Sequence, residues 1–222
     1  MTHTAAGPAG GVAPSEPYTN ITREERAGAL RTALELLELS RIVTLVRHTS
    51  ANGVPLGAEA SDSHFKPLLL DIGLCNNLCG LSLPEAVALL TVLEGGLAEQ
   101  FVGQELRSLG PAFEERSLYY WHREAKNANA EVDYLWAHQD RVVPVAVRAG
   151  TTGSLKSLQV FLAEKGRDLA VRLNLDQPST GSFTATVGRK DGTRTITYTL
   201  LSLPLYLASE LDRLLREHLS QP

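Results

Sequence analysis

The residues best placed for chemistry lie in the segment EVDYLWAHQDRVVPVAVRAG, residues 131–150. Alternating apolar residues predict a first strand, on which Asp133 is a carboxylate among large apolar side chains. A valine-rich run predicts a second strand, which ends in Ala146-Val147-Arg148. A carboxylate can hold a divalent cation for hydrolysis, and a lysine can help to position the attacking water. Asp133 could supply one acid, but the second strand ends without an acid or a lysine, so the catalytic set is incomplete.

The strand pattern also predicts which side chains share a face. On a regular strand, Val132, Tyr134 and Trp136 point to one side and Asp133 to the other. Glu131 then lies on the same face as Asp133. It is the only nearby acid that could substitute for the acid that the end of the second strand lacks. A purely structural role is the alternative, because Asp133 can pair with Arg148 on the adjacent strand, a contact worth ~0.2–1 kcal/mol.

Composition restricts the class of protein. A chain of 222 residues with 43% hydrophobic content can bury one sizeable core, with a small appended unit. The formal net charge of −4 gives no overall attraction to nucleic acid, so any such contact requires a local basic patch. Cys75 and Cys79 provide at most half a metal site and are expected to be small buried residues.

Two cysteines and no secretory signal predict a cytoplasmic protein. No apolar run approaches the roughly 18–20 residues that span a bilayer, so no membrane contact is expected. His48, His64, His122 and His138 show no ligand spacing, and no hydrolase motif occurs.

Three segments are predicted along the chain. Residues 1–20 are rich in Gly, Ala, Pro, Ser and Thr and are expected to form a disordered tail. Thr22 and Glu25 form a capping box that opens a helix to about residue 40, and a strand follows at 42–46. This helix and strand, within residues 21–60, resemble the tail of a winged-helix unit. Residues 61–222 are predicted to form the main α/β domain.

The main domain has a regular alternation of expected elements. A short apolar strand at 68–70 comes first, and the Asp191-Gly192 pair later predicts a β-hairpin, followed by a closing helix at 205–219. Between them, the expected order is helix, strand, strand, strand, helix, strand. These six elements are predicted at residues 97–109, 118–121, 132–136, 142–147, 154–165 and 169–173.

This α-β-β-β-α-β order, with an acid on the first helix and another on the second strand, resembles the restriction-endonuclease-like PD-(D/E)XK nuclease fold. A second resemblance is more specific. The segments HTSANGVPLGAE, LLLDIGLCNNLCGL, FVGQEL, YYWHRE, NAEVDYL, VVPVAVRAG and SLKSLQVFLAEKG occur in the order of an uncharacterised module. That module, a domain of unknown function, lies C-terminal to the ATPase domain in many prokaryotic AAA-type proteins. The similarity covers residues 21–173.

The resemblance implies where a catalytic site would lie. Glu105 of GQEL matches the helix acid and Asp133 of EVDYL the strand acid, and together they would hold Mg²⁺. The family usually reads close to IEVKSG where this chain reads VAVRAG, so Ala146 replaces the second acid and Arg148 the lysine. Alanine cannot bind a metal, and arginine stays protonated, so the site is expected to bind phosphate at most. An acid such as Glu105, on a leucine-bearing helix, is more often solvated or paired than a metal ligand.

A glycine-rich turn, GTTGSLKS, precedes the helix predicted at 154–165. A phosphate-binding loop needs glycine directly before the lysine, but Leu155 precedes Lys156. The turn is therefore interpreted as a strand-to-helix connection with Ser154 as the N-cap. Arg148 and Lys156 remain the candidate phosphate-binding residues.

Three functions follow from these features. The first is a non-catalytic binding or accessory module on a degenerate nuclease-like scaffold, with a nucleic acid or a protein as partner and no cofactor. The second is a Mg²⁺-dependent nuclease acting on DNA or RNA through Glu105 and Asp133. The third is an accessory domain that works with an ATPase. No Walker motif occurs, so the ATPase domain is expected to be absent from this chain, as in a stand-alone module or a truncated gene.

Overall fold

The computed structural model describes residues 27–78, 80, 96–111, 113–123, 129–148, 154–189 and 192–220. The predicted disordered tail, the capping pair Thr22 and Glu25, Cys79 and the centre of the glycine-rich turn lie outside these residues. Within them, no helix is long and apolar enough to cross a membrane.

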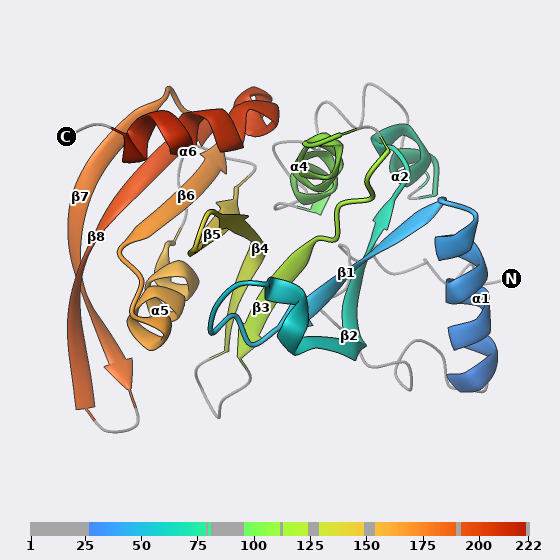
Figure 1. Cartoon of the computed structure of the whole chain (residues 1–222), viewed down its shortest axis with the longest axis horizontal. Coiled ribbons are helices and arrows are strands. Elements are labelled where there is room, and N and C mark those ends of the chain that lie inside the picture. The colour runs from blue at the N-terminus through green and yellow to red at the C-terminus, as the bar shows by residue number, and fades with distance from the viewer. Residues whose placement is uncertain are drawn as a thin grey trace, which may run out of the picture.

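The described residues form a mixed eight-stranded sheet with the order β2-β1-β3-β4-β5-β6-β8-β7 (Figure 1). The central strands β5, β6 and β8 are parallel, while β3–β4, β4–β5 and the two outer pairs β1–β2 and β7–β8 are antiparallel. The strands are β1 (Val43–Thr49), β2 (Ala60–Leu69), β3 (Tyr119–Arg123), β4 (Ala130–His138), β5 (Arg141–Val147), β6 (Leu169–Asn174), β7 (Ser179–Arg189) and β8 (Gly192–Pro204).

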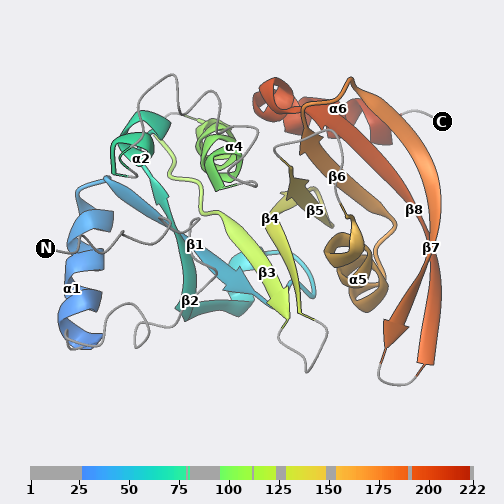
Figure 2. The ribbon, with the colours of Figure 1, turned by 180° about the vertical axis from the view of Figure 1, so that it is seen from behind.

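Helices cover both faces of the sheet (Figure 2). On one face, α4 and α6 pack over a core that includes Val102, Tyr134 and Leu211. On the other face, α5 packs over a second core that includes Trp121 and Phe161, and α1 covers β1 and β2. The helical segments are α1 (Ala27–Leu39), η2 (Leu56–Glu59), α2 (Ile72–Leu78), α4 (Gly96–Ser108), α5 (Lys156–Lys165), η3 (Leu205–Glu210) and α6 (Leu211–Leu219).

The predicted order of helix, strand, strand, strand, helix, strand is confirmed as α4-β3-β4-β5-α5-β6. The predicted hairpin is also confirmed, and its β7–β8 pairing runs without a break from Ser179–Ser202 to Arg189–Gly192. Ser154 is not the N-cap residue of α5, which is Leu155, although the Ser154 hydroxyl accepts a hydrogen bond from the Lys156 N–H at 3.3 Å.

The N-terminal strands differ from the sequence prediction. The strand predicted at 68–70 is the end of the ten-residue strand β2, whose first half is too polar to show an apolar pattern. The prediction that residues 21–60 form a separate winged-helix-like segment, with a boundary at residue 60, stays a prediction. However, β1 from that segment lies between β2 and β3, so one sheet continues across residue 60.

A β-bulge in β4 changes the predicted faces of its side chains. Tyr119 pairs with Leu135 and Trp121 with Val132, so Tyr120 alone lies opposite two residues, Asp133 and Tyr134. The extra residue reverses the alternation. Val132 and Leu135 therefore pack on the α5 side, whereas Tyr134 packs on the α4 side. The predicted common face is confirmed for Tyr134 and Trp136 and wrong for Val132, because a periodic pattern does not reveal a bulge.

Candidate functional site

Five charged residues meet on the α4 side of the sheet, and we call them the Lys66 cluster: Lys66, Glu99, Glu131, Asp133 and Arg148. Lys66 of β2 forms an ion pair with Glu131 of β4, and its Nζ lies 3.6 Å from Glu99 Oε2 of α4. Its side chain is only 10% exposed. Two strands and a helix thus bring one lysine into contact with acids that lie far away in the sequence.

Asp133 is the most enclosed member of the cluster. Its side chain is 7% exposed, and Oδ2 accepts a hydrogen bond from the Val147 backbone N–H at 2.7 Å. The same oxygen lies 3.3 Å from Arg148 Nη1, so the cross-strand ion pair predicted from the sequence forms. Arg148 Nη1 also donates to the Val147 carbonyl at 2.6 Å. Because the pair is buried on the acid side, the exposed-pair energy expected from sequence does not apply.

Burial and charge shift the titration of the cluster. Burial is the largest influence on Asp133 and raises its pKa, although Lys66, Arg148 and the Val147 N–H oppose the shift. Burial and the Asp133 charge raise the pKa of Glu99 to about 7. Burial disfavours the charged form of Lys66, but the acids outweigh it and raise the pKa of this lysine. Two cations therefore face three carboxyl groups, two of which bind protons more readily than they would in water.

Two tyrosines form the wall of the cluster. The Lys66 ammonium lies 5.0 Å from the centre of the Tyr120 ring, a cation–π distance. The Tyr134 hydroxyl donates to the Glu99 backbone carbonyl at 2.9 Å and fixes the first turn of α4. A Cβ on Gly103 would lie 2.3 Å from this hydroxyl, so only glycine permits this approach of α4 to β4.

Of the residues named from the sequence, the structure brings together Asp133, Arg148 and Glu131, the acid considered as a substitute for the missing one. Glu105 is half-buried on α4, six residues after Glu99 and so rotated by about 120° from it around the helix. Ala146 packs in the second core with α5, on the opposite face. Lys156 is exposed in the first turn of α5.

Sequence reasoning missed Lys66 and Glu99, which lie 3.6 Å apart in the cluster. The one available signal was a lysine within the apolar stretch HFKPLLL. Its partners lie 33 and 65 residues further along the chain, so local pattern could not connect them.

The described residues contain no group of three His, Cys, Asp or Glu side chains arranged to hold a metal ion. Three histidines nevertheless lie close together, although nothing in the sequence suggested that they would. The His48 and His122 rings lie 4.5 Å apart and the His64 ring 6.3 Å from His48. Burial, followed by the neighbouring His122, lowers the pKa of His48 to about 4.

Glu99→Gln is expected to change the pH dependence of stability. Because the pKa of Glu99 is raised from 4.5 to about 7 in the folded state, the folded protein binds more protons than the unfolded chain between these values. The stability that this carboxyl contributes is therefore complete below pH 4.5 and lost as the pH rises through 7. The variant lacks this loss, so its stability relative to wild type should increase from pH 5 to pH 8.

Urea denaturation of both proteins across this range measures the difference. Glu105→Gln, which removes a carboxylate of the same helix outside the cluster, controls for the change in net charge. A difference between Glu99→Gln and wild type that is constant with pH would contradict the expectation.

Residues 94–187 match the family model of DUF4143, a domain of unknown function. The match runs from the start of α4 into β7 and includes four of the five residues of the Lys66 cluster. Lys66 itself, on β2, lies before the matched range. No curated protein and no solved structure matches the chain.

Proposed function

We propose that this chain is a non-catalytic binding module on a degenerate PD-(D/E)XK nuclease-like scaffold, which serves as an accessory domain for a protein partner such as an AAA-type ATPase. The order α4-β3-β4-β5-α5-β6 supports the scaffold, because it places Asp133 on the second strand and Arg148 at the end of the third. The match of residues 94–187 to a domain of unknown function is consistent with the resemblance to an uncharacterised module of AAA-type proteins.

The single observation that carries the non-catalytic role is the state of Asp133. A carboxylate that binds a metal must present a free oxygen lone pair to it. Asp133 Oδ2 accepts the Val147 N–H at 2.7 Å and faces Arg148 at 3.3 Å, so this oxygen is already engaged and a metal could reach only Oδ1. Lys66 also lies within its electrostatic reach. A divalent cation at this carboxylate would be repelled by two positive side chains held in place by the fold.

A protein is a better partner than a nucleic acid for this face. The cluster combines three carboxylates with two cations, and the whole chain has a net charge of −4. Phosphate groups therefore meet no uncompensated positive charge at this place. If labelled DNA or RNA bound at low salt and the binding weakened steeply toward physiological salt, the partner would be a nucleic acid and not a protein.

The second candidate is a Mg²⁺-dependent nuclease, and Lys66 is the observation that favours it. The lysine absent from the end of β5 is supplied from β2, next to Glu99 and Glu131. A lysine beside two or more carboxylates is the set that this chemistry uses. In this proposal, Lys66 would position the attacking water and Asp133 would have to leave Arg148 to bind the metal.

Titration calorimetry with Mn²⁺ and a cleavage assay on DNA and RNA decide between the two candidates. For the binding module, we expect no site-specific heat and no cleavage, in wild type and in Asp133→Asn alike. The asparagine keeps an oxygen that accepts the Val147 N–H, so this variant should still fold. Mn²⁺ binding or cleavage that disappears in Asp133→Asn would establish the nuclease instead.

A further inference from the structure

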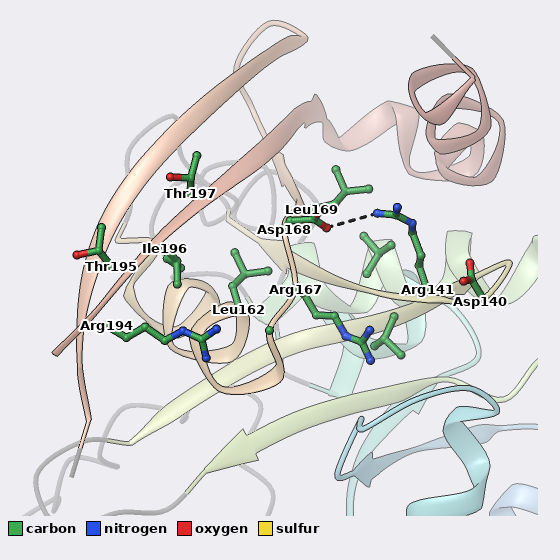
Figure 3. Close-up of a pocket in the computed structure, with 13 residues that line it drawn as sticks. Asp140, Arg141, Leu162, Arg167, Asp168, Leu169, Arg194, Thr195, Ile196 and Thr197 are labelled. Carbon is green, nitrogen blue, oxygen red and sulfur yellow. Dashed lines mark hydrogen bonds and ion pairs between the residues drawn. The ribbon is translucent and has the colours of Figure 1, made fainter. Parts of the chain in front are cut away.

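The sheet has a notch where β6 begins later than the two strands beside it. The first β5–β6 pair is Val145–Val171, four residues after the start of β5. The first β6–β8 pair is Leu169–Thr199, seven residues after the start of β8. We call the resulting gap, bounded by residues 141–143, 166–169 and 194–197, the β5–β8 notch (Figure 3).

The β8 side of the notch is a strand edge without a ladder partner in the described structure. The Thr199 N–H donates to the Asp168 carbonyl at 2.7 Å, so Thr199 directs its backbone polar groups toward β6. Because the direction alternates along a strand, Thr197 and Thr195 direct theirs the same way, into the notch. Their other neighbour, β7, pairs with β8 on the opposite side. Such an edge is a template for a further strand.

The notch contains a cavity of about 520 Å³. Its floor is apolar, because Leu162, Leu169 and Ile196 are buried there. Asp140 lies at its margin with Arg141 of β5. The floor offers contact for apolar side chains, and the polar groups lie around it.

Three arginines line the notch, and most of their N–H groups have no partner among the described residues. Arg194 Nη1 donates to the Ala163 carbonyl at 2.7 Å, and Arg167 Nη2 donates to the Asn52 carbonyl at 2.9 Å. Arg141 Nη1 lies 3.4 Å from Asp168 Oδ1. The Arg167 Nε is buried without a hydrogen-bond partner. Each guanidinium has five N–H donors, so the notch retains unused capacity for acidic groups.

We propose that the β5–β8 notch binds an extended, acidic peptide segment of a partner protein, which adds a strand along the free edge of β8. The segment's backbone would pair with Thr195 and Thr197, its apolar side chains would contact the floor, and its carboxylates would bind the arginines. This site goes beyond the proposed non-catalytic role, because it lies at the other end of β5 from Arg148, about 23 Å away.

The dimensions and the charge favour a peptide. Two strands with one missing strand between them are about 9.6 Å apart, which is the space for one extended backbone. Three arginines against two aspartates, Asp140 and Asp168, leave an excess of one positive charge. The free edge supplies N–H and C=O groups in alternation, which match a peptide backbone and not a row of phosphates.

The test is an NMR titration of the full chain with a hexapeptide of alternating valine and glutamate. We expect chemical-shift changes at the amides of Thr195 and Thr197, together with slower hydrogen exchange there and weaker binding at high salt. Two control peptides separate charge from strand pairing: one with lysine in place of glutamate, and one with N-methylated valines, which cannot donate to β8. Both should bind at least tenfold more weakly.

Matched proline variants place the site on the protein. Thr197→Pro removes an N–H that points into the notch, whereas Thr184→Pro removes one from the outer edge of β7, opposite Thr197. We expect the first variant to lose binding and the second to retain it, and Arg194→Met to weaken it. Absence of binding, equal binding of either control peptide, or binding that survives in Thr197→Pro would overturn the proposal. Shifts at the notch caused by inorganic phosphate or an oligonucleotide but not by the peptide would also overturn it.

Discussion

Lys66→Met is expected to destabilise the protein by about 3–5 kcal/mol at pH 8, the cost of removing one partner from a buried ion pair. The substitution keeps an unbranched side chain but leaves Glu99, Glu131 and Asp133 with Arg148 as the only cation of the cluster. The free energy of unfolding, measured by urea denaturation, tests the expected loss. A typical domain has only about 5–15 kcal/mol in total, so this change is large.

The loss should depend on pH in a defined direction. Lys66 lowers the pKa values of Glu99 and Asp133, so its loss raises these two pKa values further above the unfolded values. Protonation of the two carboxyls in the folded state then relieves their repulsion. The difference between wild type and Lys66→Met should therefore shrink as the pH falls from 8 to 5.

Two further variants show whether the loss of stability comes from the unpaired acids of the cluster. A second change, Glu131→Gln in the Lys66→Met background, should recover part of the stability, because it removes one unpaired acid. Lys156→Met removes an exposed lysine and should change stability by no more than about 0.5 kcal/mol. If Lys66→Met were as stable as Lys156→Met at pH 8, the Lys66 cluster would not be the buried charge network described above.

Gly103→Ala is expected to destabilise the protein by about 1–3 kcal/mol, the usual cost of overpacking a core. The new methyl group would lie 2.3 Å from the Tyr134 hydroxyl and 2.7 Å from Leu68 Cδ1. Tyr134 cannot move aside freely, because it is buried and its hydroxyl bonds to the Glu99 carbonyl. The helix propensity of alanine returns up to about 1 kcal/mol and does not offset the clash.

Gly28→Ala is the matched control for this change. Gly28 also lies in a helix, α1, but a Cβ there would meet nothing within 4 Å. The same substitution should therefore leave stability unchanged or increase it, by at most about 1 kcal/mol. Thermal or urea unfolding of both variants measures the contrast. A Gly103→Ala protein more stable than wild type would mean that α4 is not held against β4 as described.

The amino-acid sequence by itself determined the order of the secondary-structure elements from α4 to β8. Local signals suffice for this, because periodicity distinguishes a strand such as β5 from a helix such as α5, and Asp191-Gly192 marks the hairpin. The pairing of Asp133 with Arg148 was also predictable, since antiparallel neighbours joined by a short turn have a fixed register.

Only the tertiary structure decided which further charged residues join Asp133 and Arg148. Lys66 and Glu99 reach Asp133 because β1, β2 and α4 assemble against β3 and β4, and no local pattern encodes contacts between residues so far apart in the sequence. The bulge opposite Tyr120 likewise depends on how two strands pair, and it turned Tyr134 to the α4 face against the expected alternation. The β5–β8 notch exists because β6 is shorter than its neighbours, which is a property of the assembled sheet and of no single strand.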